Sequence, residues 1–175
     1  MTFLQEQGFK SAIQRIGSQL GFGSAASEPE PPTECDYSLV QSVDALERWI
    51  ARICATGMVA FDTETTSLDA SRAELVGCSL SLHPGEACYV PLGHREPDLL
   101  ANGGAIKQIP VAEALSIMKP MLEDPAILKI GQNIKYDMRV MAHHDIKIAP
   151  IDDSMLLSYV LEGGLHGHSL SLIHI

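Results

Sequence analysis

The chain has 175 residues, and 46% of them are hydrophobic, which is enough to build one domain with a buried core. No apolar run is long enough to cross a bilayer, and residues 1–20 lack the apolar block and cleavage site of a signal peptide. We therefore expect a cytoplasmic protein with no membrane partner. Twelve basic and 22 acidic residues give a net charge of −10, which excludes a protein that holds phosphates by basic charge alone. Any nucleic-acid function would need bound metal ions or another part of a longer polypeptide.

The first 36 residues fall into two segments. Apolar residues recur at helical spacing over residues 1–20 and predict an amphipathic helix. Residues 21–36 are rich in Pro, Ser, Gly and Glu and predict a flexible linker. The helix would need a neighbouring domain to cover its apolar side, and the alternative is a frayed terminal helix.

From residue 37 onward, helical and strand patterns alternate. A hairpin-led sheet followed by alternating helices and strands predicts an α/β domain with a mixed sheet and flanking helices. The predicted elements, in chain order, are a helix over 43–56 ended by Gly57, a buried strand at 58–62, a hairpin over 73–93, a helix over 111–124 bent or ended near Pro120, a strand at 126–131, a helix over 133–145, a strand at 146–150, and a helix over 152–164 capped by Asp152 or Asp153.

The four cysteines show no C-x-x-C spacing. This argues against a zinc site or a redox pair and is consistent with a reducing compartment. We expect all of them to be packing residues: Cys35, Cys54, Cys78 and Cys88.

Two carboxylates follow the predicted strand at 58–62, in the sequence FDTETTSLD. Because a strand sends alternate side chains to the same face, Asp62 and Glu64 should point into one volume while Thr63 points away. Such a pair repels itself unless a cation or a shared proton compensates. The alternative is a solvated strand end, which an isolated pair of this kind usually is.

A second acidic motif lies in GQNIKYDMRV, where Asn133 and Asp137 share one face of a predicted helix. If this helix crosses the strand, Asp62, Glu64 and Asp137 converge on one oxygen-rich pocket. Carboxylates without His or Cys select magnesium or manganese, and paired ions of this kind support phosphoryl transfer. Each motif alone could be a solvated surface, but their occurrence together favours a metal site.

At these two motifs the chain resembles the proofreading 3′-to-5′ exonuclease domain of bacterial DNA polymerase I. That domain belongs to the DEDD exonuclease superfamily and has a ribonuclease H-like fold. The resemblance covers most of residues 37–170 and implies that residues 37–175 are a partial exonuclease domain. Residues 1–20 are similar to the end of the family's 5′-nuclease region. The resemblance implies two Mg²⁺ or Mn²⁺ ions, the 3′ end of single-stranded DNA as substrate, and 5′-nuclease and polymerase domains elsewhere in the parent chain.

The resemblance also implies roles for individual residues. Asp62, Glu64 and Asp137 would be catalytic and would bind the metal ions. Leu68 would wedge among the terminal bases, although a leucine after a strand can equally be a core residue. Substrate contacts are implied for Thr63, Leu68, Gln132, Asn133 and Tyr136.

One expected motif is missing. Family members complete the metal site with Tyr-x-x-x-Asp on a later helix, but none of the tyrosines here has Asp four residues later, and no histidine has Asp five residues later. We therefore expect a fragment, truncated at both ends, that has little activity of its own.

Two other functions compete with a proofreading exonuclease. One is a non-catalytic structural module that keeps the exonuclease fold, and the other is an exoribonuclease of the ribonuclease D type. The presence of Asp62, Glu64, Asn133 and Asp137 argues against the first. The linker-like N-terminal segment and the residues of both motifs favour the polymerase over the second.

Overall fold

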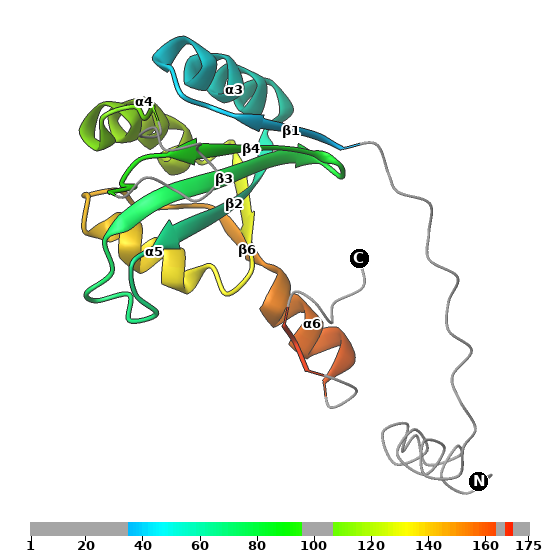
Figure 1. Ribbon diagram of the computed structural model, residues 1–175. Coiled ribbons are helices and arrows are strands. Elements are labelled where there is room, and N and C mark those ends of the chain that lie inside the picture. Colours follow the sequence, from blue (N-terminus) through cyan, green and yellow to red (C-terminus); the bar gives the residue numbers. More distant parts are fainter. Residues whose placement is uncertain (1–34, 96–106, 164–166, 170–175) are drawn as a thin grey trace, which may run out of the picture. The chain divides into compact units, whose positions relative to one another are not determined.

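The structure is a computed structural model that describes residues 35–95, 107–163 and 167–169. Residues 34–154 form one compact unit, and the chain from Met155 on belongs to a second. The whole sheet lies in the first unit (Figure 1). The helix predicted over residues 1–20 and nearly all of the predicted linker lie outside the described residues.

Six strands form one mixed sheet in the described part of the chain: β1 (Asp36–Leu39), β2 (Met58–Thr65), β3 (Leu75–His83), β4 (Glu86–Pro91), β5 (Leu128–Gly131) and β6 (Ile151–Asp153). Their order across the sheet is β1-β4-β3-β2-β5-β6. Strand β3 runs antiparallel to both β2 and β4, and the remaining pairs are parallel. This arrangement confirms the α/β mixed sheet predicted from the sequence.

The described helices of this unit are α3 (Val43–Thr56), α4 (Val111–Glu123) and α5 (Lys135–Ala142). Helices α3 and α4 pack against each other on one side of the sheet, and α5 contacts β2 (Figure 1). Helix α3 ends at Gly57, as predicted, because its φ of 74° is the left-handed conformation that glycine adopts without strain. In the described ranges, no helix has the length and apolar character needed to span a membrane.

Two strands differ from the sequence prediction. Strand β1 is not predicted, because all of its residues are exposed and no alternation marks it. The strand predicted at 146–150 is wrong, since β6 begins only at Ile151. The backbone N–H groups of Lys147 and Ala149 donate to groups at the end of α4, so this segment is bonded to a helix end before β6 begins.

The structure also gives detail at two helix ends that the sequence left open. The helix expected to bend or end near Pro120 continues through it and ends at Glu123. Asp153 directly precedes α6 (Ser154–Glu162), as predicted, and its carboxylate also accepts hydrogen bonds at the start of another helix, α5.

Only two of the four cysteines are buried packing residues. Cys78 and Cys88 are buried, as predicted, and burial raises the pKa of both thiols, that of Cys88 to about 12. Cys35 and Cys54 are exposed, so the packing prediction is wrong for these two.

Candidate active site

Asp62 and Glu64 lie near the carboxyl end of β2 and point to the same face of the sheet, as the sequence predicts. Side chains alternate along β2, so that Phe61 and Thr63 are buried while both acids are exposed. In the neighbouring β3, Asp62 lies opposite Ser79 and Glu64 lies opposite Gly77. The partners of the two acids across this edge of β2 are therefore small and uncharged.

Asp137 reaches the same strand from α5. Its side chain is buried, and Oδ1 accepts hydrogen bonds from the Thr63 backbone N–H at 2.9 Å and from the Thr63 hydroxyl at 2.5 Å. Strand β2 pairs with β5 only as far as Ala60, which pairs with Ile130. Asp137 therefore satisfies the Thr63 N–H where β2 has no strand partner on this side.

Asp62 and Asp137 lie close enough for the charge of Asp62 to act on Asp137. Burial raises the pKa of Asp137, the hydrogen bonds from Thr63 oppose this rise, and the charge of Asp62 adds to it. Partial loss of hydration also raises the pKa of Asp62, although much of its side chain is exposed. None of the ion pairs within the described residues involves either aspartate. An uncompensated acidic pair of this kind favours a bound cation.

The donor chemistry of these residues fits a hard divalent cation. Asp62, Glu64 and Asp137 offer only carboxylate oxygens, which suit Mg²⁺ and Mn²⁺. Among the described residues, however, no three His, Cys, Asp or Glu side chains are arranged so that they could hold an ion. The structure brings Asp62 near Asp137, and the contribution of Glu64 to a shared site stays a prediction.

A hollow of about 330 Å³ opens beside the acids, lined by residues 63–68 and Tyr136. The Tyr136 hydroxyl donates to the Ser67 carbonyl and is also hydrogen-bonded to the Thr65 hydroxyl, which fixes the ring against this loop. Leu68 lines the same hollow and is 99% exposed, so it is not a core leucine. The structure thus brings together four predicted site residues: Thr63, Glu64, Leu68 and Tyr136.

Gln132 and Asn133 lie in the turn between β5 and α5 and do not line this hollow. The Gln132 Oε1 accepts a hydrogen bond from the Ser154 hydroxyl at 2.6 Å, and the Asn133 backbone N–H donates to Asp153 at 3.0 Å. Their predicted place beside the scissile strand stays a prediction.

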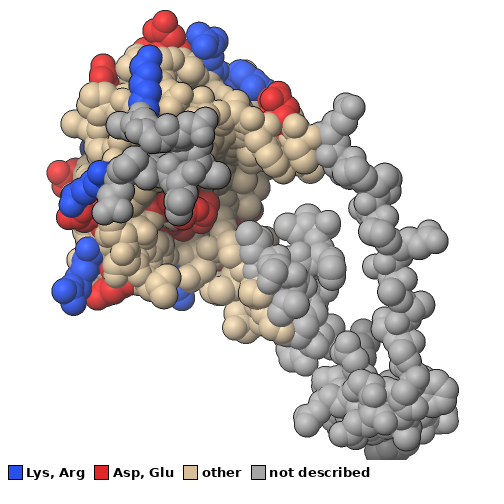
Figure 2. Space-filling view, in the orientation of Figure 1, with Lys and Arg blue, Asp and Glu red and all other residues tan. Residues whose placement is uncertain are grey.

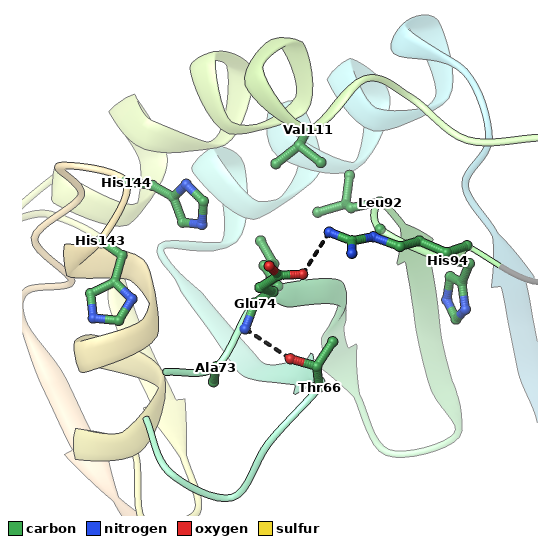
Figure 3. Close-up of a pocket in the computed structure, with 11 residues that line it drawn as sticks. Thr66, Ala73, Glu74, Leu92, His94, Val111, His143 and His144 are labelled. Atoms are coloured by element: carbon green, nitrogen blue, oxygen red, sulfur yellow. Dashed lines mark hydrogen bonds and ion pairs between the residues drawn. The ribbon is translucent and has the colours of Figure 1, made fainter. Parts of the chain in front are cut away.

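A larger hollow, of about 510 Å³, holds none of the predicted site residues (Figure 3). It shares Thr66 with the smaller hollow, and His143 and His144 line it from the end of α5. The one described carboxylate that lines this larger hollow, that of Glu74, is paired with Arg95 at 2.6 Å and is therefore compensated. The size of the larger hollow alone does not make it the functional site, because the acids without an ion-pair partner among the described residues, Asp62 and Asp137, do not line it.

The described part of the face in Figure 2 does not supply the positive charge that a phosphate backbone would need. Figure 2 shows Lys and Arg side chains interspersed with Asp and Glu on the face in view, without one continuous basic area among the described residues. With a net charge of −10, the chain repels polyanions unless cations bind to it.

Comparison with known proteins decides the family. Residues 37–173 match a protein family described as 3′-5′ exonuclease. The chain belongs to this family. The DNA polymerase I of Rhizobium leguminosarum is 42% identical over an aligned length of 175 residues, and the match covers 92% of this chain and 17% of that polymerase. The exonuclease chain therefore spans about a sixth of the length of that relative.

Solved structures confirm the ribonuclease H-like fold of this exonuclease. Escherichia coli RNase D, an exoribonuclease involved in structured RNA processing, has a TM-score of 0.53 and 19% identity, and the match covers 74% of this chain and 30% of that one. Brucella melitensis NrnC with bound Mg²⁺ has a TM-score of 0.51 and 20% identity, and the match covers 79% and 58%. Exonucleases of the matched family generally use divalent metal ions.

Sequence reasoning missed the contacts that hold the site together. Thr63 was expected to point away from the acids and to contact the substrate, and its hydrogen bonds to Asp137 were not predicted. Thr65 and Ser67 hold Tyr136, and Asp153 binds the turn before α5. The only local signal for these roles is the clustering of hydroxyl residues after Asp62.

Proposed function

We propose that this chain is the proofreading 3′-5′ exonuclease part of a DNA polymerase I, and that it hydrolyses phosphodiester bonds at the 3′ end of single-stranded DNA. The observation that supports this most is the pairing of Asp62 with Asp137, joined through Thr63, within residues that match the 3′-5′ exonuclease family. Removal of mismatched nucleotides would follow from the position of such a site beside a polymerase.

The metal-binding residues in this proposal are Asp62, Glu64 and Asp137, with Mg²⁺ or Mn²⁺ as the ions. Two such ions would supply the charge needed to activate water and to stabilise the leaving oxygen. They would also offset the negative charge of the chain, which otherwise opposes DNA binding.

The chain's own side chains would orient the substrate. Leu68 is exposed and apolar beside the hollow, where it could contact the face of a terminal base. Tyr136, held by Thr65 and Ser67, lines the same hollow. Thr63 is buried and holds Asp137, so its contribution would be to fix that carboxylate.

The parent protein in this proposal is cytoplasmic and contains 5′-nuclease and polymerase domains on the same chain. The similarity to a DNA polymerase I over a short part of its length supports this organisation. A second candidate is an exoribonuclease, which the similarity of the fold to RNase D favours.

The proposal is tested with 5′-labelled DNA and RNA single strands of the same sequence, in Mg²⁺ and in EDTA. We expect the chain extended through a Tyr-x-x-x-Asp motif to shorten DNA from its 3′ end faster than RNA, and EDTA or Asp62→Asn to stop it. The exposed Asp152→Asn serves as the control for a lost charge.

Each other outcome of this experiment excludes part of the proposal. Faster degradation of RNA would replace it with the exoribonuclease, and an inert extended chain would replace it with the non-catalytic module. We expect the 175-residue chain itself to be much slower than the extended one. Comparable rates would show that the site needs no third motif.

A further inference from the structure

Asp153, which the mechanism above does not use, binds the turn that leads into α5. It is the last residue of β6, and its side chain is buried, with 7% exposure. Its two carboxylate oxygens accept separate hydrogen bonds, Oδ1 from the Asn133 N–H at 3.0 Å and Oδ2 from the Ile134 N–H at 3.2 Å. The carboxylate therefore spans two consecutive N–H groups at the beginning of the helix.

This turn needs an outside partner. Asn133 has a φ of 54°, the left-handed conformation that residues other than glycine seldom adopt. Ile134, which directly precedes α5, has no side-chain oxygen to cap the helix. Asp153 supplies from another strand the acceptor and the negative charge that a helix N-terminus favours.

The position of Asp153 is itself well fixed. Strand β6 pairs with β5 in parallel, and Asp153 lies opposite Gly131. Ile134 packs over Gly131 so closely that a Cβ there would lie 2.9 Å from the Ile134 side chain. The end of β5, the turn and the start of α5 therefore form one tightly packed corner with Asp153.

The corner controls where Asp137 lies. Asp137 is in the first turn of α5, within four residues of both N–H groups that Asp153 binds, and α5 has only eight residues. A short helix has little other means of fixing its start. A change in the direction of its first turn would move the Asp137 carboxylate relative to Thr63 and Asp62.

We propose that Asp153 is a positioning residue of the active site: by binding the Asn133 and Ile134 N–H groups, it sets the start of α5 and thereby holds Asp137 against Thr63, beside Asp62. The effect on metal binding rests on the proposed function above. The effect on the Thr63–Asp137 contact does not rest on the proposed function, because this contact is present in the protein without metal.

The test compares Asp153→Asn with Asp152→Asn in the 175-residue chain. Both remove one charge from neighbouring residues of β6, but Asp152 is exposed. Asparagine keeps the shape of the side chain and presents an NH₂ group to one of the two N–H donors, so it can accept only one of the two bonds. Backbone amide resonances are measured by NMR in EDTA, and Mn²⁺ affinity is measured by calorimetry.

In EDTA, Asp153→Asn should shift the amide resonances of Asn133, Ile134 and, at a distance, Thr63, while Asp152→Asn leaves Thr63 unchanged. An unmoved Thr63 resonance in Asp153→Asn would overturn the positioning role. Mn²⁺ affinity should fall about 10- to 100-fold in Asp153→Asn only, as for other residues that orient a metal ligand. Equal affinity in the parent and Asp153→Asn would also overturn it.

Two further outcomes distinguish a loss of positioning from a failure of the proposed function and from misfolding. If the parent chain does not bind Mn²⁺, the proposed function fails, while the Thr63 resonance still decides the positioning role. If Asp153→Asn does not fold, the double variant with Asn133→Gly is used, because glycine adopts the left-handed turn without a partner. That second change should restore the Thr63 resonance toward its parent position, and a failure to do so in a folded double variant would count against the inference.

Discussion

Thr63 and Asp137, 74 residues apart in the sequence, are joined by two hydrogen bonds to a single carboxylate oxygen, from the backbone N–H at 2.9 Å and the hydroxyl at 2.5 Å. They connect α5 to β2 beyond the point where β2 is paired with β5. The same contact places the Asp137 charge next to Asp62. These two hydrogen bonds therefore stabilise the fold, but they also bring together two negative charges whose repulsion destabilises it.

These two effects can be separated by substituting Asp137. Asp137→Asn keeps an oxygen that can accept from Thr63 and removes the charge, so it should raise the melting temperature of the metal-free chain at neutral pH. Asp137→Ala leaves the Thr63 donors buried without an acceptor and should lower stability by about 1 to 3 kcal/mol. Thermal unfolding in EDTA, followed by circular dichroism, measures both. A lower melting temperature in both variants would contradict the like-charge argument.

The stabilisation by Asp137→Asn should depend on pH. Burial and the Asp62 charge raise the pKa of Asp137 in the folded state, whereas in the unfolded chain it is near its usual value of about 3.9. The folded state then holds its proton more tightly, so the stability of the parent falls as pH rises from about 4 through the raised pKa. The difference between variant and parent should be small near pH 4 and should grow above it. A difference that is constant with pH would exclude this origin.

Metal binding by the acids gives a third prediction. Asp62→Asn and Glu64→Gln should each weaken Mn²⁺ binding by about tenfold or more, or about 1.4 kcal/mol, because each removes a carboxylate oxygen from the proposed site. Calorimetric titration of the 175-residue chain measures the affinity, with Asp152→Asn as the matched control. If Glu64→Gln binds Mn²⁺ like the parent while Asp62→Asn does not, the site consists of Asp62 and Asp137 without Glu64.

The sequence predicts those parts of the fold whose signals are local. Side-chain alternation in β2, the hairpin over 73–93 and Gly57 after α3 are set by neighbouring residues, and all three agree with the structure. Strand β1 has no such signal because all of its residues are exposed. The start of β6 also depends on distant groups, since the preceding segment is bonded to the end of α4.

The candidate site divides in the same way. The common face of Asp62 and Glu64 follows from the two-residue period of a strand, and it could be predicted. The partners of Asp137 and Asp153 lie 74 and 20 residues away, and no spacing rule connects them. The exposure of Leu68 likewise depends on how the loop after β2 turns, and a single sequence left its burial open.

Leu68 gives a prediction in which activity and stability separate. Because its side chain is 99% exposed, Leu68→Ala should change the free energy of unfolding by less than about 0.5 kcal/mol. In the extended, active chain it should slow degradation of single-stranded DNA, because it removes the apolar group beside the hollow. The control is Leu46→Ala, which removes a fully buried leucine of α3 and should cost about 2 to 5 kcal/mol. Unchanged exonuclease rates in Leu68→Ala would rule out its contact with the bases.

The last prediction concerns Lys129, a fully buried residue of β5 with no carboxylate partner among its hydrogen bonds. Its ammonium group donates to the carbonyls of Ile127 and Ala149 at 2.6 Å and to that of Asp124 at 2.9 Å. These carbonyls belong to the chain just after α4 and just before β6, so Lys129 joins the two segments that flank β5. Burial lowers the pKa of Lys129, because the charged form loses hydration.

Lys129→Met tests which of two opposing effects is larger. Methionine keeps the apolar stem and removes a buried charge, which is favourable, but it leaves several carbonyls without a donor at about 1 to 3 kcal/mol each. With three close carbonyls affected, the loss should exceed the gain, and urea unfolding should show a destabilisation on the order of 3 kcal/mol. Lys119→Met is the control: its ammonium group also donates to a carbonyl, that of Asp145 at 2.6 Å, but at the surface, where water can replace it. Equal stabilities of the two variants would show that the buried ammonium contributes no more than an exposed one.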